Sequence, residues 1–60
     1  MTPAEYRAIR KKLGLTQAGL AALLGETREI VNRRETGVVP IEPRAAWALL
    51  GVQAHTSANT

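Results

Sequence analysis

The residues best able to form specific hydrogen bonds lie between Arg28 and Glu35, in a segment that is polar and rich in arginine on one side. Guanidinium and amide groups can bond to base edges in the major groove of DNA, and that groove admits an α-helix. If this segment is helical and lies in such a groove, it can read bases. The segment therefore indicates sequence-specific DNA binding, provided that other elements hold it in place.

The residues before and within this segment predict two short helices joined by a turn. Thr16 is an N-cap candidate for a helix from Gln17 to Leu24, and Gly25 is suited to end that helix. Thr27 is the N-cap candidate for the next helix, from Arg28 to about Thr36. The pair has the form of a helix-turn-helix.

A further helix is predicted before this pair. Thr2, Pro3 and Glu5 form a capping box with proline at the first helical position, so a helix should run from Pro3 to Leu13 and stop at Gly14.

The last predicted helix begins at Pro43. Its residues from Ala45 to Leu50 are apolar nearly all round, and Trp47 is the expected core anchor. After Val52 the segment 53–60 is small and polar, which predicts a flexible tail. We therefore expect an all-α, compact four-helix fold, or five helices if a short last turn follows, with residues 1–52 as the domain.

Composition limits the function classes. The 60 residues carry a net charge of +3, which suits a polyanionic partner. There is no cysteine, and the lone His55 has no second metal-ligand type nearby, so neither a metal nor a cofactor is expected. No carboxylate pair with evident burial and no glycine-rich phosphate loop points to an enzyme or a small-molecule substrate. No segment approaches the roughly 20 apolar residues that span a bilayer, so a cytoplasmic protein without membrane contact is expected.

The pattern from Tyr6 to Leu50 resembles a known family. The likeness rests on eight residues. Leu15, Thr16 and Gln17 form the start of the second helix, Ala21 is its small residue, and Gly25 is the turn glycine. Val31 is a buried branched residue, and Glu35 and Gly37 are the acidic residue and glycine that close the motif. In these features the chain is similar to the lambda repressor/Cro-like (XRE-type) helix-turn-helix regulators of phages and bacteria.

The resemblance implies which side chains contact double-stranded DNA. It nominates four residues for base edges in the major groove, namely Arg28, Glu29, Asn32 and Arg33. It assigns the sugar-phosphate backbone to Thr16, Gln17, Thr27, Arg34 and Thr36. Two assignments stay open: Glu29 either reads a cytosine or holds an arginine in place, and Arg34 either reaches a phosphate or packs its stem on the core. Without the family context, the same face would be an ordinary solvated surface with weak ion pairs.

The resemblance also implies a structural ion pair between Arg10 and Glu35. The chain departs from the family in the loop 38–42, which lacks basic residues, so that Arg44 and the lysines of the first helix would substitute. No fifth helix is expected of the kind that many relatives have. Without a fifth helix, Leu49 is expected in the core. Five other apolar residues are expected either in the core or in a dimer seam, that is, an interface between two copies: Val38, Val39, Ile41, Leu50 and Val52.

Together these features predict a small regulator of transcription. The leading hypothesis is a phage or bacterial repressor that binds a palindromic operator as a homodimer, with half-sites a whole number of helical turns apart. The alternative is a protein-interaction module or an antitoxin, in which the apolar loop and the last helix bind a partner protein.

Overall fold

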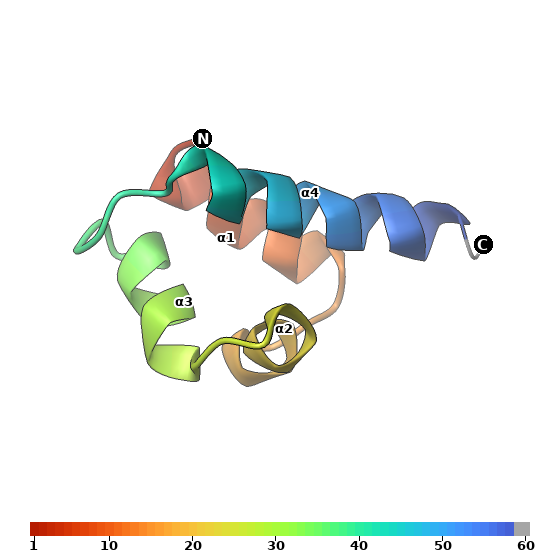
Figure 1. Ribbon diagram of the computed structural model, residues 1–60, viewed down its shortest axis with the longest axis horizontal. Helices are drawn as coiled ribbons and strands as arrows, with labels where there is room; N and C mark the ends of the chain where they lie inside the picture. The colour runs from red at the N-terminus through yellow and green to blue at the C-terminus, as the bar shows by residue number, and fades with distance from the viewer. Residues whose placement is uncertain (59–60) are drawn as a thin grey trace.

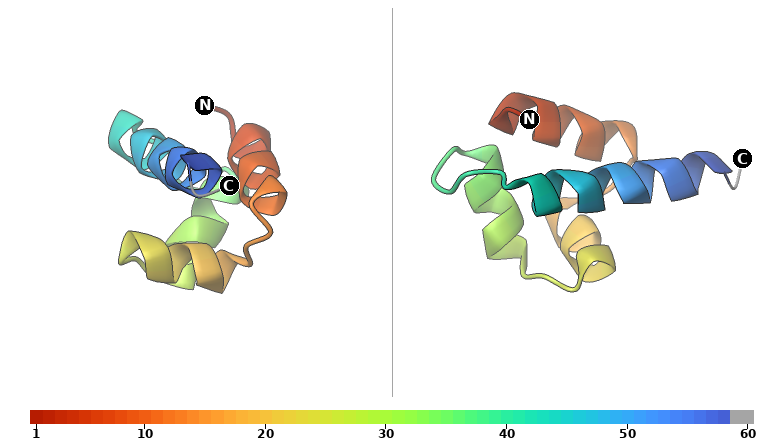
Figure 2. Two further views of the ribbon diagram at one scale, coloured as in Figure 1. Left: turned by 90° about the vertical axis from the view of Figure 1, so that its right-hand side faces the viewer. Right: turned by 45° about the horizontal axis from the view of Figure 1, so that its top comes forward.

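The computed structural model describes residues 1–58 and confirms an all-α fold with four helices in that range. The helices are α1 (Pro3–Lys12), α2 (Gln17–Leu24), α3 (Arg28–Glu35) and α4 (Pro43–Ala58). Helices α1 and α4 lie side by side, and α2 and α3 lie across one side of this pair (Figures 1 and 2). The second and third helices thus form a layer of their own beneath the first and last.

Threonine begins each of the first three helices, as predicted. The hydroxyl of Thr2 accepts from the backbone of Glu5 at 3.1 Å, and the Glu5 carboxylate accepts from the backbone of Thr2 at 2.8 Å, which completes the capping box. Thr16 accepts from the backbone of Gly19 at 2.9 Å, and Thr27 from that of Ile30 at 3.4 Å. Each cap satisfies a backbone N–H that has no partner within its own helix.

Gly25 ends α2 in the left-handed conformation, with φ 68° and ψ 31°. The end of α2 is closed there by the backbone N–H of Glu26, which bonds to the carbonyl of Ala21 at 2.8 Å. A side chain at this position would be strained by the positive φ rather than by crowding, since a Cβ would meet nothing within 4 Å. The glycine therefore sets the angle at which the chain enters α3.

One core joins all four helices. Its fully buried members come from every helix, and partly buried side chains surround them. The prediction that Leu49 is a core residue is confirmed. Of the residues left open between core and dimer seam, Ile41 and Val52 pack on this core, whereas Val38 and Leu50 are exposed. The buried set is Tyr6, Leu20, Ala21, Val31 and Leu49.

The prediction that Trp47 anchors the core is wrong, because its side chain is 72% exposed. Helix α4 turns Ala45, Leu49 and Val52 toward the body, at helical spacings of four and three. Two residues before Leu49, Trp47 is on the far side of the helix. A segment that is apolar all round has no period to show which face is buried. The large size of Trp47 therefore did not show whether its side chain is buried.

Helix α4 also continues past Val52, after which a flexible tail was expected. It includes Gly51 and reaches Ala58, so residues 53–58 are helical rather than a frayed tail. A single exposed glycine costs only about 1 kcal/mol in a helix, and no proline follows it to force an end. Residues 59–60 of the expected tail lie outside the described range, and the domain limit at residue 52 stays a prediction.

Candidate nucleic-acid interface

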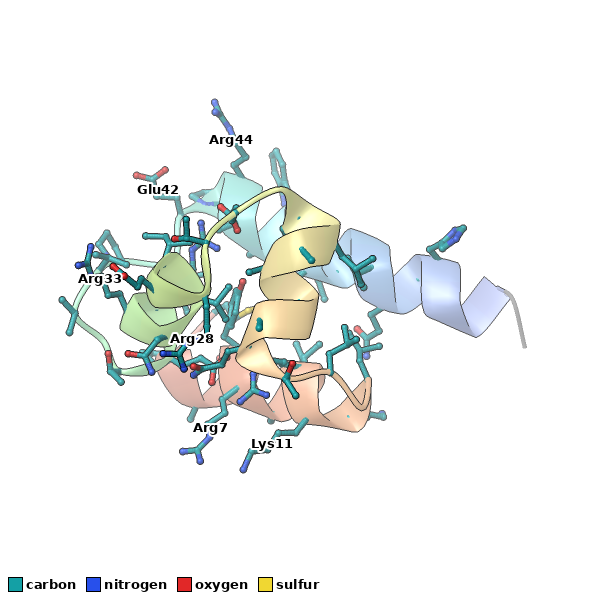
Figure 3. All side chains as sticks on the ribbon, turned by 90° about the horizontal axis from the view of Figure 1, so that it is seen from below. Arg7, Lys11, Arg28, Arg33, Glu42 and Arg44 are labelled. Carbon is teal, nitrogen blue, oxygen red and sulfur yellow. The ribbon has the colours of Figure 1, made fainter. Side chains whose placement is uncertain are left out.

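Helix α3 presents an exposed polar face. Arg28, Glu29, Asn32 and Arg33 are all exposed, because the opposite face of the helix packs against the core through Val31. Spacings of one and four residues place these four side chains on one side of a helix. In Figure 3, Arg28 and Arg33 project from α3, and Arg7 and Lys11 project from α1 beyond Arg28. The four residues nominated for base contact are therefore brought together on one accessible surface.

Glu29 and Arg33 form the only ion pair found on this face within residues 1–58. The Arg33 guanidinium lies 3.7 Å from the Glu29 carboxylate, and both side chains are more than half exposed. Such a pair stabilises a helix by only a few tenths of a kcal/mol. Arg33 is thus free to exchange this partner for another acceptor at little cost.

The interior side of α3 is held to α1 by Arg10 and Glu35, the pair implied by the family resemblance. Arg10 Nε donates to Glu35 Oε2 at 2.6 Å, and Arg10 Nη2 donates to Oε1 at 3.0 Å. The third guanidinium nitrogen donates to the carbonyl of Leu15 at 2.8 Å. Both side chains are nearly buried, at 10% and 3% exposed, and the hydrogen bond to Glu35 raises the pKa of Arg10. This pair fixes the end of α3 against the first helix.

Gln17 connects that ion pair to the exposed face. Its Nε2 donates to Glu35 Oε1 at 3.3 Å, and its Oε1 accepts from Asn32 Nδ2 at 3.4 Å. These residues line a polar cleft of about 200 Å³ between three helices, together with Arg7 and Thr36. Gln17, nominated for a phosphate, is therefore already bonded to two side chains of α3.

The three threonines nominated for the DNA backbone are exposed at helix ends. Thr16 and Thr27 use a hydroxyl lone pair to accept from the backbone, so that each hydroxyl proton is still available for a phosphate oxygen. Thr36 instead donates to the carbonyls of Asn32 at 3.0 Å and Arg33 at 3.3 Å. Its hydroxyl could then only accept from a further group.

Arg34 differs from the other nominated residues because it is buried. It makes a bidentate contact with Glu26, with Nη1 to Oε1 and Nη2 to Oε2 both at 2.6 Å. Nη1 also donates to the Tyr6 hydroxyl at 3.3 Å, and the guanidinium carbon lies 5.9 Å from the centre of the Tyr6 ring. Of the two roles left open for Arg34, its burial favours the one inside the fold over the phosphate contact.

Sequence reasoning did not find this cluster. Glu26 lies in the turn and Tyr6 in α1, so the three residues meet only in the folded chain. The one available signal was an arginine at a core-facing position of α3, because a buried guanidinium is strongly destabilising unless an acidic group pairs with it. The Arg34 guanidinium holds the pKa of Glu26 below its usual range, and burial raises the pKa of Tyr6.

Two further features bear on function. None of the helices in residues 1–58 is long and apolar enough to cross a membrane. Over the same residues, no group of three or more histidine, cysteine or acidic side chains is placed to hold a metal ion.

Comparison with known proteins bears on the same surface. A family model described as helix-turn-helix matches residues 7–52, which include α2, α3 and the turn between them. Searches of curated proteins and of solved structures each found no match. The matched family is a DNA-binding regulatory domain rather than an enzyme family. This chain therefore belongs to the lambda repressor-like helix-turn-helix family and is a DNA-binding regulator.

Proposed function

We propose that the chain is a repressor that binds a palindromic DNA operator as a homodimer, with α3 of each copy in the major groove. The observation that carries this proposal is the arrangement of α3. Its inner residues are fixed by ion pairs, while Arg28, Glu29, Asn32 and Arg33 remain exposed together. A polar face that is exposed to solvent and held in place by buried contacts is what base recognition requires.

The roles on this face follow from hydrogen-bonding chemistry. Arg28 and Arg33 can each donate two bonds to O6 and N7 of guanine, and Asn32 suits adenine. Glu29 can accept from cytosine N4, or it can orient Arg33 through their existing contact. Thr16, Gln17 and Thr27 lie at the starts of α2 and α3, where they can contact phosphates while α3 lies in the groove.

The test is selection of bound duplexes from a random DNA library at near-physiological salt, followed by sequencing. We expect enrichment of an inverted repeat whose half-sites lie about one helical turn apart, or a multiple of it. Arg33→Ala should weaken binding by about 1 to 3 kcal/mol and relax the preference at one base pair of each half-site. Lys12→Ala, which removes an exposed cation of α1 that could contact only a phosphate, is the charge-matched comparison and should weaken binding without relaxing the preference at any base pair. Failure of the wild-type protein to enrich any motif would contradict the proposal.

Repression and dimer formation need measurements of their own. A reporter with the selected site overlapping its promoter should lose expression when the protein is present, and Arg33→Ala should restore expression. A complex with the inverted repeat should contain two copies of the chain by mass. Activation of the reporter, or a complex with one copy, would overturn the corresponding part of the proposal.

A second candidate function is docking of a partner protein, and one observation favours it. Large apolar side chains are exposed in α2, in the loop and in α4, where Leu23 is 62%, Val38 69% and Trp47 72% exposed. If partner binding is the function, Trp47→Lys should abolish it in the cell and Arg33→Ala should not. The reverse result would favour base recognition.

A further inference from the structure

The side chains of Arg10, Glu35, Gln17 and Asn32 form one continuous chain of hydrogen bonds from the core to the DNA-binding face. We infer that this chain, named here the amide relay, fixes the polarity of the Asn32 side chain and so makes that residue select adenine. The inference rests on the proposed base-reading function of α3. It assigns Gln17 as a positioning residue for base recognition, in addition to any phosphate contact.

The polarity begins at the buried end. Arg10 can only donate hydrogen bonds, and the Glu35 carboxylate that it binds can only accept them. Glu35 Oε1 lies 3.3 Å from the Gln17 amide, so Gln17 must turn its NH₂ group toward the carboxylate. The opposite orientation would place two acceptor oxygens against each other. The ion pair therefore decides which end of the Gln17 amide faces inward.

The same logic carries the polarity outward. With its NH₂ turned toward Glu35, Gln17 presents its oxygen to Asn32, 3.4 Å from Asn32 Nδ2. An oxygen can only accept, so Asn32 must donate one of its two Nδ2 protons to Gln17. The second Nδ2 proton and Oδ1 of Asn32 remain unused within residues 1–58 and lie on the exposed side of α3.

This residual pattern matches one base. Adenine offers N7 as an acceptor and its N6 amino group as a donor, so Asn32 can bond both with Nδ2 and Oδ1. Guanine offers two acceptors in the major groove, O6 and N7, and would leave Oδ1 opposed to an oxygen. Cytosine and thymine each offer a single polar group there. An asparagine without the relay could reverse its amide, and its selectivity would fall.

The experiment compares duplex selection by the wild type with selection by three variants. Asn32→Ala identifies the base pair that Asn32 contacts, which we expect to be A·T. Gln17→Met should reduce the adenine preference at that base pair about tenfold or more, while the other positions of the motif keep theirs. Gln53→Met, the same change in the later part of α4, is the matched control and should leave the motif unchanged. Gln17→Ala serves as a second variant if Gln17→Met is not folded by circular dichroism.

The outcomes separate the relay from the proposed function. A uniform loss of affinity in Gln17→Met with the adenine preference intact would show a phosphate contact only and would overturn the relay. A base other than adenine at the Asn32 position would also overturn it. In the absence of DNA, the NMR signals of the Asn32 side-chain amide should shift in Gln17→Met and not in Gln53→Met. Such a shift in a protein that selects no motif would place the failure in the proposed function rather than in the relay.

Discussion

At the scale of single residues, the arginines of this chain divide by what surrounds them. Arg10 and Arg34 are nearly buried and each binds a carboxylate through two nitrogens, whereas Arg28 and Arg33 are exposed. A bidentate guanidinium–carboxylate contact fixes direction as well as distance. The buried arginines therefore orient α3, and the exposed ones are left for a partner.

Replacement of Arg10 by methionine tests the pair with Glu35. The change leaves a carboxylate that is 3% exposed without its cation, which typically costs about 3 to 5 kcal/mol. We expect the free energy of unfolding in a denaturant titration to fall by that amount. Arg44→Met removes an exposed arginine and should change it little. Equal stability of Arg10→Met and the parent would show that the pair has no structural role.

The pair between Glu26 and Arg34 predicts a dependence of stability on pH. Arg34 lowers the pKa of Glu26 in the folded chain, so the pair contributes stability above the ordinary carboxyl pKa. That contribution is lost as the pH falls through the lowered pKa. Thermal midpoints measured from pH 7 to pH 3 should therefore differ most between wild type and Glu26→Gln at neutral pH, and converge in acid. A constant difference across this range would contradict the assignment.

At the scale of elements, the structure is a set of short helices whose ends are set by local signals and whose faces are set by packing. Thr16, Gly25 and Thr27 define where α2 and α3 begin and end. Helices of eight residues gain little stability from their own hydrogen bonds. Their orientation comes from the core and from the two ion pairs beneath α3.

Gly25 provides a test at this scale. Gly25→Ala should cost about 1 to 2 kcal/mol, because alanine disfavours the left-handed backbone found there and no clash adds to the cost. Gly25→Asn should cost less, since asparagine tolerates that conformation better. The free energy of unfolding by denaturant measures both. An alanine variant as stable as the wild type would mean that the turn adopts another conformation.

These distinctions explain how much the sequence could predict. Caps, the turn glycine and the polar face of α3 depend on residues close together in the chain, so the four helices and the helix-turn-helix were predicted. The exposure of Trp47 depends on which side of α4 faces the body, and nothing in an apolar run such as Ala45–Leu50 specifies that side. The contact of Arg34 with Glu26 and Tyr6 joins three elements and becomes evident only in three dimensions. The contact of Arg10 with Glu35 also joins distant elements, and it was predicted only because the family resemblance implied it.

At the scale of the whole molecule, charge and apolar surface are segregated. No aspartate, glutamate, lysine or arginine follows Arg44, so α4 beyond its first turn carries no fixed charge. A groove between α2 and α4 is lined by apolar residues that include Leu23, Leu24, Ala48 and Val52, with His55 at its edge. Arg28 and Arg33 project instead from the layer that contains α3 (Figure 3). The arginines of α3 and the apolar groove between α2 and α4 thus belong to different elements.

Trp47 makes the apolar surface measurable, because it is the only tryptophan and is 72% exposed. In dilute solution its fluorescence should be typical of a solvated indole and readily quenched by acrylamide. If two copies associate through α4, emission should shift to shorter wavelength and quenching should fall as concentration rises. Unchanged spectra in a sample shown to be dimeric would place the dimer contact elsewhere. Trp47→Ala should leave the stability of the monomer nearly unchanged.

Because α3 is short, it should not keep its structure or its function outside this protein. Eight residues form little more than two turns, and isolated helices shorter than about 12 to 15 residues are marginal in water. A synthetic peptide of residues 28–35 should therefore be largely unfolded and should not discriminate between DNA sequences. Grafting its four exposed side chains onto another scaffold would transfer the chemical groups but not the buried contacts that aim them. The base recognition proposed here is therefore a property of the assembled fold, because it depends on buried residues that hold α3 in place.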